Sequence, residues 1–476
     1  MLADDVLLEV FHFYVNQPRD GIEGEDEDED IRKRKKRIEA WQTLVHVCRR
    51  WRSVVFGSPR RLNLRLVCAP KTRAWCTVDV WPALPLVIQD FYCRSGSVDN
   101  IVGLLERSDL VRRTSQISLW EVGSSQLEDI WEAMQVPFPE LTYLILQHRY
   151  DETEPVFPLF GLFLGGSASR LRTLELHCIP YPGLPKLLLS ATHLTSLRLY
   201  RIPDSGYISP EAMAACLSTL TSLERVYLGF RSSRPLPNQQ SQRPPPSIRT
   251  SLPVLDEFGF QGGGEYLEVL VARIDAPQLS RLDITFFNDI EFVTPQFTRF
   301  ISHTPTFEAF DEARVTLWES SANIELSSNY AKLNASLNVS VYCRELDWQL
   351  SFLEQVCTSP LPSLSRLQHL YMFGRPWPKD WKVNLDYVQW LELLHSFSTV
   401  KDLYLSKGLA PCVVPALQDF VGGRTTEVFP NLQNIFVEKL QKSGAVQEGI
   451  GKFVAARQVT GHPITVSHWN RYSNKL

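Results

Sequence analysis

The sequence lacks the features that mark membrane-embedded and exported chains. Its most apolar run, Val156 to Gly166, falls well short of the roughly 18 residues that a membrane-spanning helix needs, and Pro and Gly interrupt it. The opening residues place Asp4 and Asp5 where a secretory signal carries basic side chains. We therefore expect no membrane span and no secretory signal, and a cytoplasmic or nuclear location.

An excess of charge of one sign is also missing. The chain has 53 acidic against 49 basic side chains and a net charge of −4, so bulk attraction to nucleic acid or to an anionic membrane is not expected. The nine cysteines are scattered, and none forms a CxxC pair. This distribution favours reduced, mostly buried thiols over a disulfide framework. We expect neither nucleic acid nor a membrane as a partner.

The short motifs of common enzyme classes do not occur. Gly449-Ile-Gly-Lys-Phe453 lacks the spacing and the Ser or Thr of a phosphate-binding loop, and Gly262-Gly-Gly264 lacks the dinucleotide fingerprint. The ten histidines form no HExxH, and His462 and His468 have no cysteine nearby. No GxSxG turn is present. We therefore predict that the protein is not an enzyme and binds no metal ion or cofactor.

What the sequence does contain begins with a small all-α module over residues 1–57. Three- and four-residue steps between apolar residues predict a first helix that carries Leu2, Val6, Leu7, Val10, Phe11 and Tyr14. A second helix is predicted over 38–56, with an apolar stripe formed by Ile38, Trp41, Leu44, Val45, Cys48, Trp51 and Val55. A module of this size buries too little surface to be stable alone. It therefore either packs against the rest of the chain or offers an apolar face to a partner.

A charged insertion over 17–37 separates the two predicted helices. Six acidic residues, Glu25 to Asp30, are followed after Ile31 by six basic residues, Arg32 to Arg37. Runs of like charge favour a solvated, extended chain, so an exposed linker is the leading interpretation. A nuclear-import signal in the basic half is the alternative. The adjacent acidic run opposes binding to nucleic acid.

From residue 58 onward a short apolar pattern recurs. The pattern is Leu-x-x-Leu-x-Leu, a short strand whose alternating apolar residues face one side. The first six clear copies start 30, 23, 29, 32 and 24 residues apart. The nine clear copies begin at Leu141, Leu171, Leu194, Leu223, Leu255, Leu279, Leu367, Val400 and Leu432. Weaker copies occur at 64–66, 86–88, 117–119 and 337–339. One more is expected at 315–317, with Phe307 and Phe310 as the alternative frame.

The stretches between these strands are typical of helices. Ser209-Pro210-Glu211 begins one of them with a capping residue, a proline at the first helical position and an acid. Repeated strand–helix units predict an α/β fold, an irregular leucine-rich-repeat-like solenoid over 58–476 with parallel strands on the concave side and helices outside. The proline-rich stretch 231–251 fits no repeat and is predicted to be an exposed loop. Binding of an SH3- or WW-like module there is the alternative.

The N-terminal module resembles an F-box. The resemblance is carried by Leu2-x-Asp-Asp-Val-Leu-Leu-Glu-Val-Phe11 and by Trp41-x-x-Leu-x-x-Val-Cys-Arg-Arg-Trp51-Arg-x-Val. The run from Ser58 to Leu66, which opens the repeats, is similar to the large F-box families of mushroom-forming fungi. With the repeats included, the resemblance extends over essentially the whole chain.

The resemblance implies that the chain is a substrate receptor of a ubiquitin ligase. F-box proteins dock on a Skp-type adaptor within a Skp–cullin–F-box ligase, and the leucine-rich array recruits a target protein. By position, the resemblance implies adaptor-binding roles for Leu2, Val6, Leu7, Val10, Phe11, Val47, Cys48 and Trp51. The alternative is a non-catalytic interaction scaffold that does not engage the ligase, in which these residues pack as a cap on the solenoid.

The strand residues that alternate with the inward leucines point to the concave face, which is the extended binding surface of a solenoid. Tyr, Trp and Arg are common among interface hot spots, although strands also favour aromatic residues for packing reasons. The predicted target-binding residues are Trp120, Glu175, His177, Arg198, Tyr200, Tyr227, Asp283, Tyr371, Tyr404 and Phe436. Tyr371, Tyr404 and Phe436 lie on successive late strands, which predicts an aromatic ladder.

Overall fold

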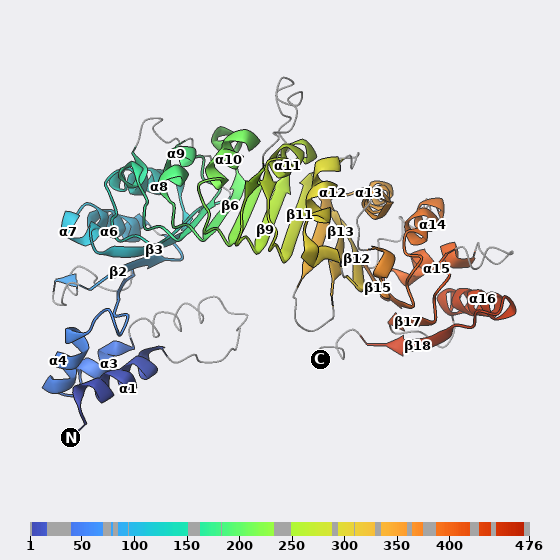
Figure 1. Ribbon diagram of the computed structural model, residues 1–476, viewed down its shortest axis with the longest axis horizontal. Helices are drawn as coiled ribbons and strands as arrows, with labels where there is room; N and C mark the ends of the chain where they lie inside the picture. Colours follow the sequence, from blue (N-terminus) through green and yellow to red (C-terminus); the bar gives the residue numbers. More distant parts are fainter. Residues whose placement is uncertain are drawn as a thin grey trace. The chain divides into compact units, whose positions relative to one another are not determined.

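The structure is a computed structural model in which the chain divides into two compact units, Met1–Tyr207 and Ile208–Leu476. Each unit contains mostly parallel strands with helices along one face, which confirms the predicted α/β class (Figure 1). The structure describes residues 2–16, 40–69, 78–79, 84–93, 95–150, 162–181, 183–232, 249–287, 294–308, 310–328, 335–358, 364–374, 387–418, 428–438 and 444–470. The charged insertion over 17–37 and residues 233–248 lie outside these ranges.

Among the described residues, three helices belong to the N-terminal module of the first unit. They are α1 (Asp4–Asn16), α3 (Trp41–Val45) and α4 (Arg49–Gly57). The prediction of one continuous helix over 38–56 is wrong, because Cys48 has extended backbone angles, φ −160° and ψ 169°, between α3 and α4. Its Sγ accepts a hydrogen bond from the Trp51 backbone N–H at 3.4 Å. Cys48 therefore caps the start of α4 and is exposed, instead of joining the buried stripe.

The core of this module continues into the residues that follow it. In the part of the chain that the structure describes, its buried side chains are Leu7, Leu8, Phe11, Trp41, Leu44, Val45, Val55, Leu62, Leu64 and Leu84. The Trp41 Nε1–H donates to the Arg65 carbonyl oxygen at 2.9 Å, which joins α3 to the segment that enters the first strand. The module therefore packs against the chain after it, one of the two outcomes that its small size predicts.

The remainder of the first unit alternates strands and helices. The strands are β1 (Leu66–Cys68), β2 (Leu86–Asp90), β3 (Thr114–Val122), β4 (Tyr143–His148), β5 (Thr173–His177) and β6 (Ser196–Ile202). They pair in chain order, and every pairing is parallel. The connecting helices are α6 (Ser95–Leu105), α7 (Ser108–Val111), η1 (Phe163–Gly166), α8 (Ser124–Ala133), α9 (Leu184–Ser190) and η2 (Asp204–Gly206).

The register of these strands follows from the Leu-x-x-Leu-x-Leu pattern. Leu144, Leu174 and Leu197 lie side by side on β4, β5 and β6, and all three are buried. Because side chains alternate along a strand, this register places every residue between the leucines on the opposite face. The strand frames predicted at Leu141, Leu171 and Leu194 are therefore confirmed.

The second unit contains ten strands in one sheet and a short separate pair among its described residues. The strands are β7 (Arg225–Phe230), β8 (Thr250–Ser251), β9 (Glu257–Gly262), β10 (Ile274–Asp275), β11 (Arg281–Phe287), β12 (Glu312–Trp318), β13 (Ser321–Ser327), β14 (Ser336–Tyr342), β15 (His369–Gly374), β16 (Asp402–Leu405), β17 (Asn434–Glu438) and β18 (Thr465–Trp469). The helices are α10 (Pro210–Leu217), α11 (Gly264–Val271), α12 (Pro295–Ser302), η3 (Pro305–Glu308), α13 (Leu346–Thr358), η4 (Leu364–Arg366), α14 (Tyr387–His395), α15 (Ala410–Gln418) and α16 (Ala445–Val459). None of the described helices in either unit is long and apolar enough to span a membrane.

An antiparallel meander interrupts the parallel strands of this unit. The spatial order is β11-β14-β13-β12-β15, with β13 antiparallel to both of its neighbours. A turn at Glu319 and Ser320 reverses the chain between β12 and β13. Because the meander has an odd number of strands, β14 still runs parallel to β11 and β12 parallel to β15. The prediction of parallel strands throughout is wrong at this point.

Two other segments differ from the sequence prediction. Thr250 and Ser251, at the end of the stretch predicted to be a loop, form β8 and pair with β10. The strand β18 at the end of the sheet was not predicted, and it pairs in parallel with β17. Its residues lack the leading Leu of the repeat pattern, so only tertiary pairing identifies it.

Within the second unit, polar side chains cap the helices of the strand–helix repeats. Ser209 caps α10 as predicted, since its Oγ accepts from the Ala212 backbone N–H at 3.2 Å. Glu268 of α11 accepts from the backbone N–H groups of Gln296 and Phe297 at 2.9 and 2.8 Å. It therefore supplies the first turn of α12 with the acceptors that the helix cannot provide itself. Burial raises the pKa of the Glu268 carboxyl, and these two hydrogen bonds oppose that rise.

Candidate protein-binding surfaces

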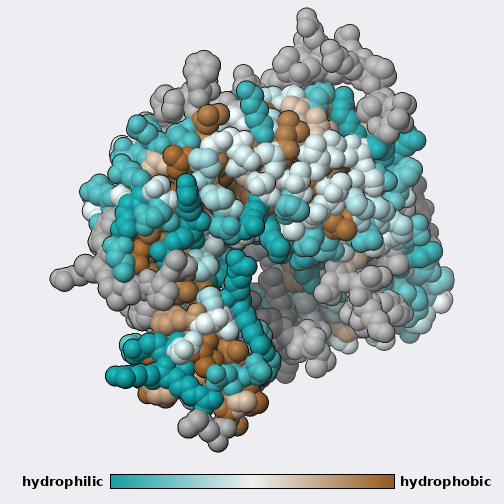
Figure 2. Space-filling model, turned by 60° about the vertical axis from the view of Figure 1, so that its left-hand side comes forward, coloured by the Kyte–Doolittle hydropathy of each residue, from teal (hydrophilic) through white to brown (hydrophobic). Residues whose placement is uncertain are grey.

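Helix α1 has one apolar face inside the module and another at its surface. Leu7 and Phe11 are buried, and the Phe11 ring lies 4.7 Å from that of Trp51. Four other apolar side chains, one helical turn or so apart, are 46–66% exposed: Leu2, Val6, Val10 and Phe13. We call these four residues the α1 patch. Figure 2 shows hydrophobic side chains at the surface of this module, at the lower left of the view.

The turn between α3 and α4 lies beside the start of α1. Arg50 donates from Nη2 to the Leu2 carbonyl oxygen at 2.5 Å and to Asp4 Oδ1 at 2.7 Å. On this turn Val47 is 59% exposed, and Cys48 is exposed as well. The turn therefore adds one apolar side chain close to the Leu2 end of the α1 patch.

The structure divides the eight residues that the F-box resemblance assigns to adaptor binding. Leu2, Val6, Val10, Val47 and Cys48 are at the surface, Trp51 is half-buried, and Leu7 and Phe11 are in the core. Sequence reasoning missed Phe13, which is 66% exposed. Its spacing from Leu2, Val6 and Val10 places it on the same helical face, so a 3.6-residue period would have found it.

In both units, the strand face turned away from the helices carries the residues predicted to bind a target. In the first unit the structure brings Trp120, His177 and Tyr200 together across β3, β5 and β6. The His177 ring stacks on Tyr200 at 4.3 Å and lies 5.5 Å from Trp120. Its Nε2 is 2.7 Å from Glu175 Oε1, and Arg198 is in register with Glu175 on the next strand. These five predicted residues therefore form one continuous surface.

Sequence reasoning missed two residues that complete this first surface. The Phe91 ring stacks nearly parallel to Trp120, at 6.4 Å between centroids. On β4, which lies between β3 and β5, Gln147 donates to Glu121 Oε1 at 3.0 Å. Phe91 follows β2 directly and lies outside any repeat frame, so the pattern gave no indication of its position.

The predicted aromatic ladder is present in the second unit. The rings of Tyr371 and Tyr404 stack at 4.2 Å and 11°, and those of Tyr404 and Phe436 at 4.5 Å and 9°. Each ring is half-buried, because its faces are covered by its neighbours. Burial raises the pKa of the Tyr371 and Tyr404 hydroxyls, and the negative charge of Glu312 adds to this effect at Tyr371.

Two further aromatic residues extend the ladder. The Trp469 ring of β18 lies 5.5 Å from Tyr404 and 5.7 Å from Phe373, and both Trp469 and Phe373 are buried. The Arg314 guanidinium lies 5.9 Å from the Tyr371 ring centroid and 5.8 Å from that of Phe373. A cation is therefore already accommodated against these rings, a contact that is favourable within about 6 Å.

Polar residues continue the same face beyond the ladder. The Asp283 Oδ1 accepts from Asn338 Nδ2 at 2.9 Å, and the Asn338 Oδ1 accepts from Asn323 Nδ2 at 3.2 Å. Burial raises the pKa of the Asp283 carboxyl. The next strand brings Arg314 within 3.2 Å of both Glu312 and Glu325. Of these residues only Asp283 was predicted, because the meander that supplies the others has no clear repeat pattern.

Tyr227 differs from the other tyrosines of this face. Its ring lies over Gly259 of β9, where an added Cβ would come within 2.4 Å of the Tyr227 Cδ2. The Tyr227 hydroxyl donates to Gln261 Oε1 at 3.1 Å. Tyr227 therefore lies along the sheet, and the glycine makes that conformation possible.

Within the described residues, no group of three or more His, Cys, Asp or Glu side chains is arranged to bind a metal ion. The strand faces instead combine stacked rings with ion pairs that are partly exposed to solvent. This composition suits contact with another macromolecule, because aromatic and Arg side chains supply most interface energy.

Comparisons with known proteins add little to this description. No protein-family model matches the chain, and the comparison with curated proteins found no match. Among solved structures, the chain is similar to one from "Crystal structure of TLR13-ssRNA13 complex", with 12% sequence identity and a TM-score of 0.27. The similarity covers 79% of this chain and 46% of that chain, so this chain spans less than half the length of the protein it matches. A likeness of this extent says nothing about what the present chain binds.

Proposed function

We propose that this chain is an F-box substrate receptor with a leucine-rich-repeat-like array. The N-terminal module binds the Skp-type adaptor of a Skp–cullin–F-box ubiquitin ligase, and the strand faces bind a target protein. The observation that carries the proposal is the division of α1 into a buried apolar face and an exposed one. Packing of the module's core accounts for the apolar residues on the buried face, but not for those on the exposed face.

The composition of the exposed face supports an interface. A surface helix usually shows polar residues on the side away from the core, whereas α1 shows Val6, Val10 and Phe13, and Leu2 precedes them just before the helix. Contiguous exposed apolar side chains mark interaction sites in soluble proteins. Ion pairs of Asp4 with Arg50 and of Glu9 with Arg61 lie beside them, which gives the apolar centre and polar rim of a protein–protein interface.

The strand faces support the second half of the proposal. Tyr371, Tyr404 and Phe436 are half-buried, so their edges remain open to a partner while their stacking fixes their orientation. Rigid, pre-ordered aromatic rings lose little conformational entropy on binding. In the first unit Trp120, His177 and Tyr200 form a similar arrangement.

The proposal is tested by size-exclusion chromatography of the full chain with a purified Skp-type adaptor. Fully burying a Val side chain is worth about 1.5–3 kcal/mol, and roughly half of Val6 and of Val10 is exposed, so the adaptor can gain about 1 kcal/mol from each. Replacing both with Asp also leaves carboxylates in the interface. We therefore expect Val6→Asp with Val10→Asp to weaken binding at least about a hundredfold.

The matched control adds two carboxylates elsewhere on the module. Ser53 and Gly57 are exposed on α4, so Ser53→Asp with Gly57→Asp should leave complex formation unchanged. If the wild-type chain forms no complex, the receptor proposal is abandoned and the non-ligase scaffold becomes the better account. If both double variants lose binding equally, the α1 patch is not the docking surface.

A further inference from the structure

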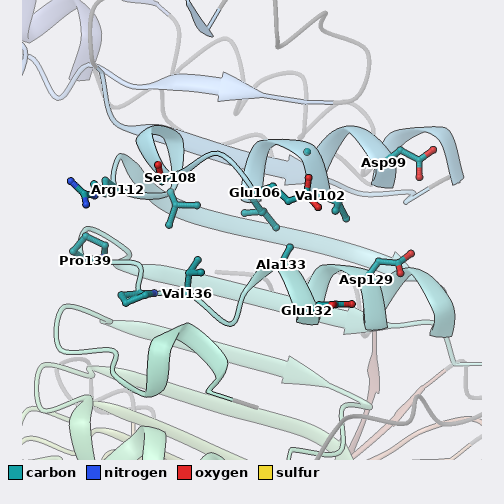
Figure 3. A pocket seen from close by; sticks show the side chains of 14 residues that line it. Asp99, Val102, Glu106, Ser108, Arg112, Asp129, Glu132, Ala133, Val136 and Pro139 are labelled. Atoms are coloured by element: carbon teal, nitrogen blue, oxygen red, sulfur yellow. The ribbon is translucent and has the colours of Figure 1, made fainter. Parts of the chain in front are cut away.

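A groove in the first unit lies on the helix side of that unit's strands. It has a volume of about 890 Å³ and runs between α6 and α7 on one side and α8 with the loop after it on the other (Figure 3). Apolar side chains make up much of its lining: Val102, Leu105, Val111, Ala133, Val136, Pro137 and Pro139. Val136 is 43% exposed, so part of this apolar lining is in contact with solvent.

Four carboxylates stand on the facing walls of the groove. Asp99 and Glu106 come from α6 and the residue after it, and Asp129 and Glu132 come from α8 (Figure 3). All four are exposed, and none has an ion pair or a side-chain hydrogen bond with another residue that the structure describes. The nearby Arg107 does not neutralise them, since it is paired with Asp79 and Asp109 at 2.8 and 3.1 Å.

The distribution of charge along the groove is uneven. Among the described lining residues, Arg112 is the one basic side chain, and Figure 3 places it beside Pro139, away from Asp99 and Asp129. Four carboxylates against one guanidinium leave a net charge of −3 over an apolar floor. Such a surface repels nucleic acid and anionic lipid, both of which present phosphates.

The chemistry of the lining defines the occupant. Carboxylates without counter-ions favour a cation, whereas the apolar lining favours a ligand that also carries aliphatic side chains. A free polyamine meets only the first requirement. We propose that this groove binds a basic amphipathic segment of a partner protein, in which Lys or Arg alternates with apolar residues. Its basic side chains lie over Asp99, Glu106, Asp129 and Glu132, and its less basic end lies near Arg112.

The proposal is tested with the full chain and a fluorescein-labelled peptide in which four lysines alternate with leucines, followed by fluorescence anisotropy. We expect saturable binding to the wild-type chain. The variant that carries Asp99→Asn, Glu106→Gln, Asp129→Asn and Glu132→Gln should bind at least tenfold more weakly. All four positions are exposed, so the substitutions should leave the fold intact.

A matched control separates the groove from the total charge of the chain. Four exposed carboxylates on the second unit likewise have no ion pair or side-chain hydrogen bond with a residue that the structure describes. The control variant carries Glu308→Gln, Glu319→Gln, Glu345→Gln and Asp347→Asn. This control should keep wild-type affinity. If the control loses binding as much as the groove variant does, peptide binding depends only on the net charge of the chain and the proposal is wrong.

Three further measurements identify the occupant. Spermine, and a peptide with serine in place of the leucines, should each bind at least tenfold more weakly than the original peptide, and equal binding would contradict the apolar role of the groove. Val102→Ser with Val136→Ser should weaken binding of the leucine-containing peptide only. Val6→Asp with Val10→Asp should leave peptide binding unchanged, because the α1 patch is a separate surface. Failure of the wild-type chain to bind the peptide overturns the proposal.

Discussion

Replacing Phe11 with Ala should open the N-terminal module while the sheet of the second unit stays folded. Phe11 is fully buried, and its ring lies 4.7 Å from Trp51 within a small core, of which the structure describes ten buried side chains. A buried Phe→Ala change costs about 3–5 kcal/mol, of which the aromatic contact supplies about 0.5–1.5 kcal/mol. A small core has little stability to lose, so the module should unfold locally before the rest of the chain.

Hydrogen exchange measured peptide by peptide is the appropriate assay. A loss of about 3–5 kcal/mol corresponds to exchange of the α1, α3 and α4 amides that is faster by roughly 10²- to 10⁴-fold, at about 1.4 kcal/mol per factor of ten. Val10→Ala is the matched control, since Val10 is 52% exposed on the same helix, and it should change these rates less than about fivefold. Equal effects of the two substitutions would refute the assignment of separate buried and exposed faces to α1.

The remaining predictions concern the second unit. Because burial raises the pKa of the Tyr371 and Tyr404 hydroxyls above the usual value of 10.0, the stability they contribute is complete below about pH 10 and is lost as the pH rises through their folded-state values. The urea midpoint of the wild-type chain should therefore fall as the pH rises above about 10, and Tyr371→Phe with Tyr404→Phe should reduce that fall. An identical fall in both chains would contradict the burial of these hydroxyls. Glu268→Ala removes the acceptors for two backbone N–H groups of α12 and should cost about 1–2 kcal/mol by urea denaturation, whereas Glu268→Gln, which keeps an acceptor oxygen, should cost less. Equal losses would show that the carboxylate charge, and not the hydrogen bonds, matters at this position.

Local sequence was enough to predict most strands of the two units. In Leu144, Leu146 and their equivalents, a two-residue apolar alternation coincides with the buried face, so pattern and burial agree. The strand β13 has the same alternation in Ala322, Ile324 and Leu326 but no leading Leu, and its antiparallel pairing depends on the turn before it. Pairing of that kind is set by contacts distant in sequence, so the repeat pattern could not predict it.

In the candidate surfaces too, the repeat pattern predicted some residues, whereas others are brought in only by tertiary packing. The ladder of Tyr371, Tyr404 and Phe436 was predicted, because each residue occupies the same position in its own repeat. Trp469 joins it from a strand that the pattern does not mark, and the contact exists only through tertiary packing. On α1, both Phe11 and Val10 fit an apolar helical period, and only the packing of α4 decides which of them is buried.

The groove between α6 and α8 gives no signal in the sequence. Its carboxylates come from two helices about thirty residues apart in the chain, and no local motif connects Asp99 with Asp129. These carboxylates lie close together because consecutive strand–helix repeats pack in parallel, which brings equivalent positions of neighbouring helices side by side. Sites of this kind can be found only once the helices are placed.

The central claim is that the exposed face of α1 is an adaptor interface, and calorimetric titration of the wild-type chain with a Skp-type adaptor tests it most directly. The account predicts one binding site per chain and a negative heat-capacity change, because the α1 patch is removed from water on binding. No detectable binding at micromolar concentrations, or binding with a heat-capacity change near zero, would contradict it.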